Sequence, residues 1–256
     1  MKIIIKIYMK INKILRTEYL KLGNRINILF FALSVLFFLK DFFLVGLDLS
    51  LSNKSNLSAN MVYNPLTHSL ISSVNILTIW IIQNVGSEFS NKIVQRNIIN
   101  GFTRSDYFLT KFSFLLLISC FFALCSSITI LSFVKINHIE IQWHYIITRA
   151  FTVFTYATSI GSIAFFIIFV LRNSLYATIC YFVYFFSEII LNRLSPDGFS
   201  RYLPITIFRK SINDNPKLVS SFFDISNTDI AIHTLLFALI ITTSYFLFLK
   251  RDFSPL

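Results

Sequence analysis

The sequence predicts an all-α integral membrane protein: six transmembrane helices, an N-terminal amphipathic interfacial helix, and a short cytoplasmic helix between the second and third spans. Three observations predict this class. Of the 256 residues, 55% are hydrophobic and 14% are charged, whereas soluble domains carry about 25% charged residues. Apolar runs of about 20 residues recur, which is the length that crosses the hydrocarbon core of a bilayer. The alternating pattern of a membrane β-barrel is absent, so the spans are expected to be helical, because lipid offers no partner to unpaired backbone groups.

Residues 1–25 form the first predicted element, a basic amphipathic helix. Lysines recur at helical spacing between Lys2 and Lys21, and isoleucines and leucines occupy another face. Such a helix is suited to lie in the cytoplasmic membrane interface. A secretory signal peptide is the alternative, but its basic region would be too long and no small-residue cleavage site follows the first span. The helix is kept even if the chain starts at Met9.

The remaining chain, 26–256, is expected to form one membrane domain. Its six apolar runs are 26–47, 66–86, 112–134, 146–171, 174–192 and 230–249. Only residues 171–174 join the fourth and fifth spans, which predicts a tight hairpin. The loop 87–111 joins the second and third spans, and the longest connection, 193–229, joins the fifth and sixth.

The distribution of lysine and arginine predicts the orientation, because these residues gather on the cytoplasmic side. With both termini, the 87–111 loop and the 171–174 turn inside, that side holds 14 of the 23 basic residues and four of the 12 acidic ones, or +10 of the net +11. The 193–229 connection is then extracellular. The same rule explains the basic excess without a nucleic-acid partner. Abundant Ile, Lys, Asn and Phe suggest an AT-rich bacterial genome, so we expect the bacterial cytoplasmic (inner) membrane.

The loop 87–111 is the most polar stretch in the first half of the chain. Residues 91–100 predict a short helix with Ile93, Val94, Ile98 and Ile99 as its apolar side chains. Gly101 can end this helix in the left-handed conformation that glycine adopts readily. A solvated, positively charged connector is the alternative.

The order of residues in this loop resembles a known family. Glu88 at the end of the second span, the short helix, and then Gly-x-Thr-Arg-Ser-x-Tyr and a lysine within 101–111 resemble the type-2 permeases of bacterial ATP-binding cassette (ABC) exporters. The stretch RTEYLKLGNR at 16–25, six spans with both ends inside, and a long outer connection fit the same family. Asn91-Lys92 stands where the family often has Gly-Thr or a similar pair.

The resemblance implies that 26–256 is a permease domain and that 87–111 is its coupling loop, whose helix docks on a separate ABC ATPase subunit. The residues expected to couple are Glu88, Ile93, Val94, Ile98 and Arg104. Glu88 and Arg104 are expected to pair across the loop. A second permease copy, identical or related, is also implied. Because the chain lacks a G-x-x-x-x-G-K-[ST] phosphate loop, ATP and Mg are expected on the partner, and this chain is expected to bind no cofactor or metal and not to be an enzyme.

Polar side chains at helical spacing mark the spans that line a pathway or a dimer seam. The candidates are Asn75 and Gln83 in the second span and Thr178, Tyr181 and Glu188 in the fifth. In lipid such faces turn inward. For Glu188 the alternative is a structural carboxylate, paired with Arg193 or a neighbouring span. Hydroxyl residues also recur in the fourth span, from Thr148 to Ser162, where helix packing is the alternative.

Two other classes of function compete with a transporter. One is a non-transporting membrane anchor or assembly subunit. The other is an intramembrane enzyme, but residues 158–162 lack the Gly-x-Ser-x-Gly elbow of a serine hydrolase. The three cysteines lie inside apolar runs and are expected to be buried apolar side chains, without disulfide or metal spacing. With no fixed charge in mid-membrane, the expected substrate is amphipathic, lipid-like or a peptide.

Overall fold

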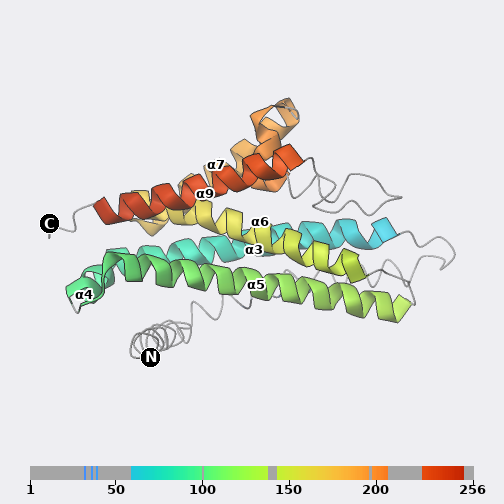
Figure 1. Cartoon of the computed structure of the whole chain (residues 1–256), viewed down its shortest axis with the longest axis horizontal. Coiled ribbons are helices and arrows are strands. Elements are labelled where there is room, and N and C mark those ends of the chain that lie inside the picture. The colour runs from blue at the N-terminus through green and yellow to red at the C-terminus, as the bar shows by residue number, and fades with distance from the viewer. Residues whose placement is uncertain are drawn as a thin grey trace.

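The computed structural model describes residues 59–99, 101–137, 143–195, 198–206 and 227–250, together with positions 32, 36 and 39. Within these residues the chain is helical and has no strand, which confirms the all-α class. The elements are α3 (Ala59–Ser90), α4 (Ile93–Ile99), α5 (Arg104–Asn137), α6 (Trp143–Leu171), α7 (Ser174–Leu194), η2 (Phe199–Tyr202) and α9 (Asn227–Lys250). The long helices lie roughly side by side in a bundle (Figure 1).

Helix α6 occupies the centre of this bundle. It contacts α3, α5, α7 and α9, and 78% of its apolar stretch is buried, against 33% for α5 and 17% for α7. A helix that is apolar all round must be surrounded by other helices or by lipid. The four neighbouring helices therefore pack around α6, and their other faces lie on the outside of the bundle.

Within the part of the chain that the structure describes, three helices are long and apolar enough to cross a membrane: Arg104–Ile128, Ala150–Leu171 and Ser174–Leu194. They coincide with the apolar runs expected at 112–134, 146–171 and 174–192. Thr234–Lys250 in α9 is a shorter apolar helix, and the run at 66–86 lies within α3. Helix 1–25, the first span apart from its three described positions, and most of 193–229 lie outside the described residues. The count of six spans stays a prediction.

The outward faces of α5 and α7 are strongly apolar. On α7 the exposed large side chains include Leu175, Ile179, Phe182, Val183, Phe186 and Ile190. Contiguous exposed apolar surface marks a membrane or protein contact, so these faces fit a membrane-associated protein. Cys120 and Cys180 are exposed on the same two helices and Cys125 is half-buried, so the expectation that all three cysteines are buried was wrong.

The connection between α6 and α7 is the tight hairpin expected at 171–174. Helix α6 ends at Leu171 and α7 begins at Ser174, with Arg172 in the left-handed region at φ 54°. The Asn173 side chain caps α7 by accepting from the backbone N–H of Leu175 at 2.9 Å and of Tyr176 at 3.3 Å. Asparagine is among the best residues at this position, because its side chain satisfies donors that the first turn leaves open.

Two glycines allow helices to approach closely. A Cβ on Gly161 of α6 would lie 2.2 Å from Leu115 Cδ1 of α5. A Cβ on Gly86 of α3 would lie 2.8 Å from the Cα of Ser174, at the start of α7. The second clash involves backbone, which cannot turn aside as a side-chain end can. Gly86 therefore sets the distance between α3 and the hairpin.

We expect Gly86→Ala to destabilise the protein by about 1–3 kcal/mol, the usual cost of overpacking, although alanine favours a helix over glycine by about 1 kcal/mol. The thermal unfolding midpoint of the detergent-solubilised protein measures this effect. Ser87→Ala, at the next and exposed position, is the control and should change the midpoint little. A Gly86→Ala protein as stable as the wild type would contradict the close approach.

Candidate functional site

The helix expected in the 87–111 loop exists as α4, which lies across one end of the bundle between α3 and α5 (Figure 1). It is shorter than the expected 91–100. Lys92, just before it, has φ 55°. At its other end Gly101 has φ 90°, Gly101 N–H donates to the Ile98 carbonyl and Phe102 N–H to the Asn97 carbonyl, both at 3.0 Å. This is the Schellman pattern of a glycine C-cap, which confirms the role expected for Gly101.

A capping box starts α5 immediately after this turn. Asp106 N–H donates to Thr103 Oγ1 at 3.1 Å, and Thr103 N–H donates to Asp106 Oδ2 at 3.2 Å. These reciprocal bonds satisfy donors that the first turn of a helix leaves open. The exit from α4 and the entry into α5 are thus both fixed by local hydrogen bonds.

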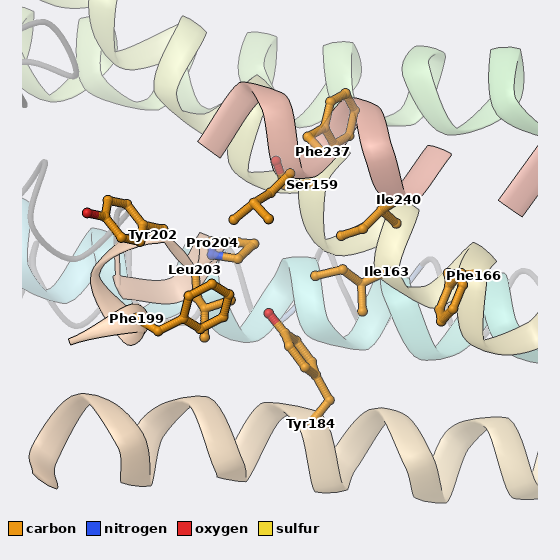
Figure 2. Close-up of a pocket in the computed structure, with 11 residues that line it drawn as sticks. Ser159, Ile163, Phe166, Tyr184, Phe199, Tyr202, Leu203, Pro204, Phe237 and Ile240 are labelled. Atoms are coloured by element: carbon orange, nitrogen blue, oxygen red, sulfur yellow. The ribbon is translucent and has the colours of Figure 1, made fainter. Parts of the chain in front are cut away.

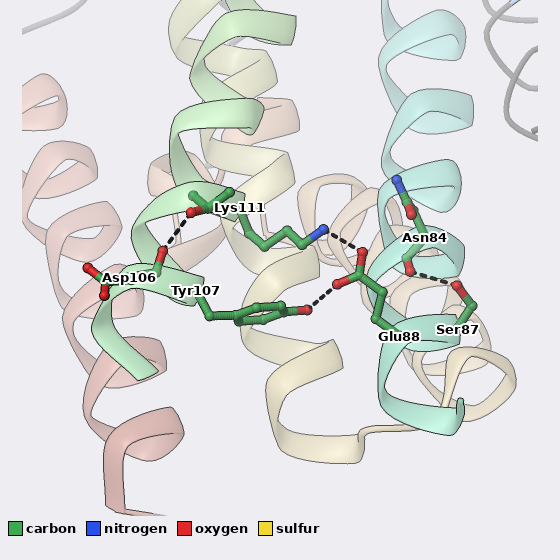
Figure 3. Close-up of polar contacts among 7 residues, drawn as sticks. Asn84, Ser87, Glu88, Asp106, Tyr107 and Lys111 are labelled. Atoms are coloured by element: carbon green, nitrogen blue, oxygen red, sulfur yellow. Dashed lines mark hydrogen bonds and ion pairs between the residues drawn. The ribbon is translucent and has the colours of Figure 1, made fainter. Parts of the chain in front are cut away.

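A buried ion pair joins α3 to α5 beside α4 (Figure 3). Lys111 Nζ lies 2.6 Å from Glu88 Oε1, and both side chains are 2% exposed. Tyr107 Oη donates to Glu88 Oε2 at 2.6 Å, and Lys111 Nζ lies 5.6 Å from the centroid of the Tyr107 ring. Tyr107 and Lys111 share a face of α5 because they are four residues apart. Both carboxylate oxygens of Glu88 therefore bind α5.

The start of α5 is also tied to the end of α9. Arg104 Nη1 donates to the Leu249 carbonyl at 2.6 Å, one of the last carbonyls of α9, which have no partner within the helix. A cation at a helix C-terminus is also favoured by the helix dipole. Ser105 Oγ and Tyr245 Oη are 3.0 Å apart. We expected Glu88 to pair with Arg104. In the structure, Lys111 is the ion-pair partner of Glu88, and Arg104 binds α9 instead.

Aromatic rings surround the ion pair and link four helices. The Phe248 ring of α9 stacks on Tyr107 of α5 with centroids 5.5 Å apart, and lies 5.0 Å from Phe169 of α6. Phe89 of α3 meets Phe169 edge-on at 6.0 Å. Such aromatic pairs stabilise by about 0.5–1.5 kcal/mol beyond their buried area. The cluster has no signal in the sequence, because nothing in a chain with 30 phenylalanines distinguishes these from the others.

The apolar residues of α4 divide between the bundle and the outside. Val94 is fully buried in the core, and Ile98 is partly buried and packs against it. Ile93 is half-buried, whereas Ile99 is 82% exposed. Val94 therefore anchors α4 to its own chain, and a role for it in coupling to a partner stays a prediction. The side chains that α4 presents outward are instead Arg96 and Ile99.

Four of the residues expected to line a pathway or seam bind one another between α3 and α7. Tyr181 Oη donates to Asn75 Oδ1, and Gln83 Nε2 donates to Thr178 Oγ1 at 3.1 Å. Tyr181 is also almost completely buried. These side chains hold two helices of the same chain together, as interhelical hydrogen bonds do in membranes. A further role in a pathway or a seam stays a prediction.

The hydroxyl residues of α6 are satisfied within their own helix. Ser159 Oγ donates to the Thr155 carbonyl and Ser162 Oγ to the Thr158 carbonyl, each at 2.8 Å. Both serines are buried. Bonding to the carbonyl four residues back is a common solution for Ser and Thr in a helix. This arrangement favours the packing interpretation of the fourth apolar run.

Glu188 receives backbone donors from the segment that follows η2. Its Oε1 accepts from the N–H of Ile205 at 2.7 Å and of Thr206 at 3.0 Å. Its Oε2 accepts from Tyr184 Oη, and the residue is 1% exposed. The alternative to a pathway or seam role was a structural carboxylate paired with Arg193 or a neighbouring span, and backbone amides as partners were not expected. A pathway or seam role for Glu188 stays a prediction. In the sequence, Pro204 is the signal that could have indicated this contact. Proline favours the first position of a helix, and the backbone N–H groups that follow it need acceptors.

Chemistry that needs a metal cluster has no support in the described ranges. Within them, no three of His, Cys, Asp and Glu gather where they could hold a metal ion. The charged and polar groups at both ends of the bundle instead bind helices to one another. The arrangement can transmit force between helices.

We expect Glu88→Gln to lower stability by about 3–5 kcal/mol, because removing one partner of a buried pair leaves the other charge uncompensated. Adding Lys111→Met, which removes that charge as well, should recover most of the loss. Thermal unfolding of the detergent-solubilised single and double variants measures both effects. Ser90→Ala, exposed on the same helix, is the control. If the double variant is less stable than Glu88→Gln, the pair does not act as one unit.

The comparisons with known proteins leave the family open. No protein-family model matches this chain, and no curated protein matches it.

Proposed function

We propose that this chain is the transmembrane permease subunit of an ABC exporter and that α4 is its coupling helix. The observation that carries the proposal is a short helix held rigidly across two long apolar helices, with Arg96 and Ile99 directed outward. A solvated connector does not need a buried ion pair, a glycine C-cap and a capping box to hold it in place. A helix that receives force from a partner does.

The contacts around α4 supply a route for that force. Glu88 and Lys111 tie α3 to α5, and Arg104 ties α5 to the end of α9. Phe169 brings α6 into the same aromatic cluster. A displacement of α4 by a partner therefore moves four packed helices together, because a packed core transmits strain.

The charge distribution supports a cytoplasmic position for the α4 end of the bundle. The described basic residues at that end are Lys92, Arg96, Arg104, Lys111, Arg172 and Lys250, and the described acidic ones are Glu88 and Asp106. An excess of basic residues is typical of the cytoplasmic side. An ATPase in the cytoplasm would meet α4 in this orientation.

The proposal includes two partners. ATP hydrolysis belongs to a separate ATPase, since the sequence has no phosphate loop. A second permease copy completes the transporter, and the exposed apolar face of α7 offers one surface for it. The same face is suited to lipid, so the stoichiometry of the purified complex decides between these two neighbours.

We expect Ile99→Asp to weaken ATPase binding by about tenfold or more, because an unpaired charge buried in a contact costs several kcal/mol and 1.4 kcal/mol is tenfold in affinity. The fold should be kept, since the side chain is 82% exposed. The variant is co-expressed with an ABC ATPase that co-purifies with the wild type, and co-purification and stimulated ATP hydrolysis are measured. If no ABC ATPase co-purifies with the wild type, the proposed function is overturned.

The control for this experiment is Trp143→Asp, which adds the same charge at an exposed position at the opposite end of the bundle. It should leave ATPase binding unchanged. If Ile99→Asp binds and stimulates the ATPase as the wild type does, α4 is not the coupling helix. An ATPase that binds the wild type without any stimulation would favour a membrane anchor over a transporter.

A further inference from the structure

An apolar pocket of about 260 Å³ lies between α6, α7, α9 and the segment around η2 (Figure 2). Its walls include Ile163 and Phe166 of α6, Phe199 and Leu203 at η2, and Leu236 and Phe237 of α9. Tyr184 of α7 closes another side. The pocket thus lies at the end of the bundle opposite α4, where η2 packs against α7 and α9.

Three described side chains of this pocket carry a hydroxyl group, namely Ser159, Tyr184 and Tyr202. Two of these hydroxyls are bonded within the protein, and that of Tyr202 points away from the other labelled residues (Figure 2). Ser159 Oγ donates to the Thr155 carbonyl, and Tyr184 Oη donates to Glu188. Among the described residues that line the pocket, no side chain is charged. Binding sites for polar ligands present a few polar groups that converge on the ligand. The hydroxyl groups of Ser159 and Tyr184 are bonded to the protein instead. The pocket therefore selects a ligand part that needs no hydrogen bond.

Glu188 holds one wall of the pocket in place. Leu203 and Pro204 line the pocket, and the next two residues, Ile205 and Thr206, donate their backbone N–H groups to the Glu188 carboxylate. Glu188 is almost completely buried, so the attachment is shielded from competing water. The wall is thereby preformed, as is usual for a ligand pocket.

The volume suits a flexible apolar chain. An apolar protein cavity of about 150 Å³ stays dry and binds benzene, and this pocket is larger. For an amphiphile that arrives from water, every methylene group that enters the pocket strengthens binding by about fourfold. A chain that arrives from lipid gains packing contacts instead, because lipid is already apolar. The pocket also lies between helices whose outer faces are apolar, so an amphiphile dissolved in the membrane can reach it with its chain.

We propose that this pocket binds the hydrocarbon chain of an amphiphile. The proposal assigns a cargo class to the exporter and rests on the proposed function for that step. Chain binding itself requires no ATPase. Binding and coupling are therefore measured separately, and either can fail while the other holds.

The experiment measures protection of a thiol placed in the pocket. Cys120, Cys125 and Cys180 are replaced by alanine, and Ser159→Cys introduces a thiol of nearly the same size. The protein is held in a steroid detergent, which has no alkyl chain. Dodecylphosphocholine should slow modification of this thiol by N-ethylmaleimide about tenfold or more, whereas butylphosphocholine, with the same headgroup, should not.

Leu239→Cys is the matched control, because Leu239 is exposed on α9 between the pocket residues Phe237 and Ile240. Its rate of modification should change less than twofold with dodecylphosphocholine. Equal slowing at both positions means general coating by amphiphile and overturns the proposal. No slowing at either position also overturns it, and so does protection by an apolar peptide but not by dodecylphosphocholine.

A second measurement covers the case in which Ser159→Cys does not fold. Dodecylphosphocholine should raise the unfolding midpoint of the wild type, because a ligand that binds only the native state stabilises it. Leu236→Trp, which fills the pocket, should abolish that rise. A rise of equal size in this variant overturns the proposal. Protection of the Ser159→Cys thiol after reconstitution into lipid bilayers, without added amphiphile, would identify membrane lipid as the source of the chain.

Discussion

The buried pair of Glu88 and Lys111 is the interaction on which the arrangement of this end of the bundle depends. Removing two charges from water costs several kcal/mol for each ion, and the pair repays this only with good geometry and further hydrogen bonds. Both conditions hold, since the ions are 2.6 Å apart and Tyr107 occupies the second carboxylate oxygen. A shift of α5 along α3 by one turn would separate the charges. The pair therefore specifies the register of these helices more than it adds to stability.

Other contacts extend this register to the rest of the bundle. Arg104 binds the last turn of α9, and the tilted ring pair of Phe169 and Phe248 joins α6 to α9. Gly86 allows the start of α7 to approach α3 closely. Polar bonds fix which residues meet, while apolar packing around α6 provides most of the buried surface. This division is expected where lipid removes the hydrophobic driving force between helices and leaves packing and hydrogen bonds.

The two ends of the bundle use carboxylates in different ways. Glu88 binds side chains on one neighbouring helix, whereas Glu188 binds the backbone of a short segment. The first joins long helices into a unit, and the second holds a wall over an apolar pocket. Under the proposed function these ends would receive force from the ATPase and hold cargo, respectively. Helix α6 passes between them and is the most buried of the three apolar helices described as long enough to cross a membrane. It is the element through which they would communicate.

The sequence by itself determined the features that depend on neighbouring residues. The helical class follows from long apolar runs, and Gly101 and Asn173 act on turns within a few residues of themselves. The partner of Glu88 had a weaker local signal, the spacing of Tyr107 and Lys111 by one turn. The sequence carries no signal for which side of α4 faces the bundle. Val94 and Ile99 are both apolar, and only packing against the bundle buries the first and leaves the second exposed.

Only the tertiary structure decided the contacts between distant residues. Tyr181 and Asn75 are 106 positions apart, and Arg104 and Leu249 are 145 apart. Such pairs depend on which helices lie side by side and at what register, and that is set by the packing of whole helices around α6. From the sequence, a polar residue in an apolar run is therefore expected to have a hydrogen-bond partner. The partner is chosen by the fold, because several helices offer suitable donors and only their packing brings one of them within hydrogen-bond distance.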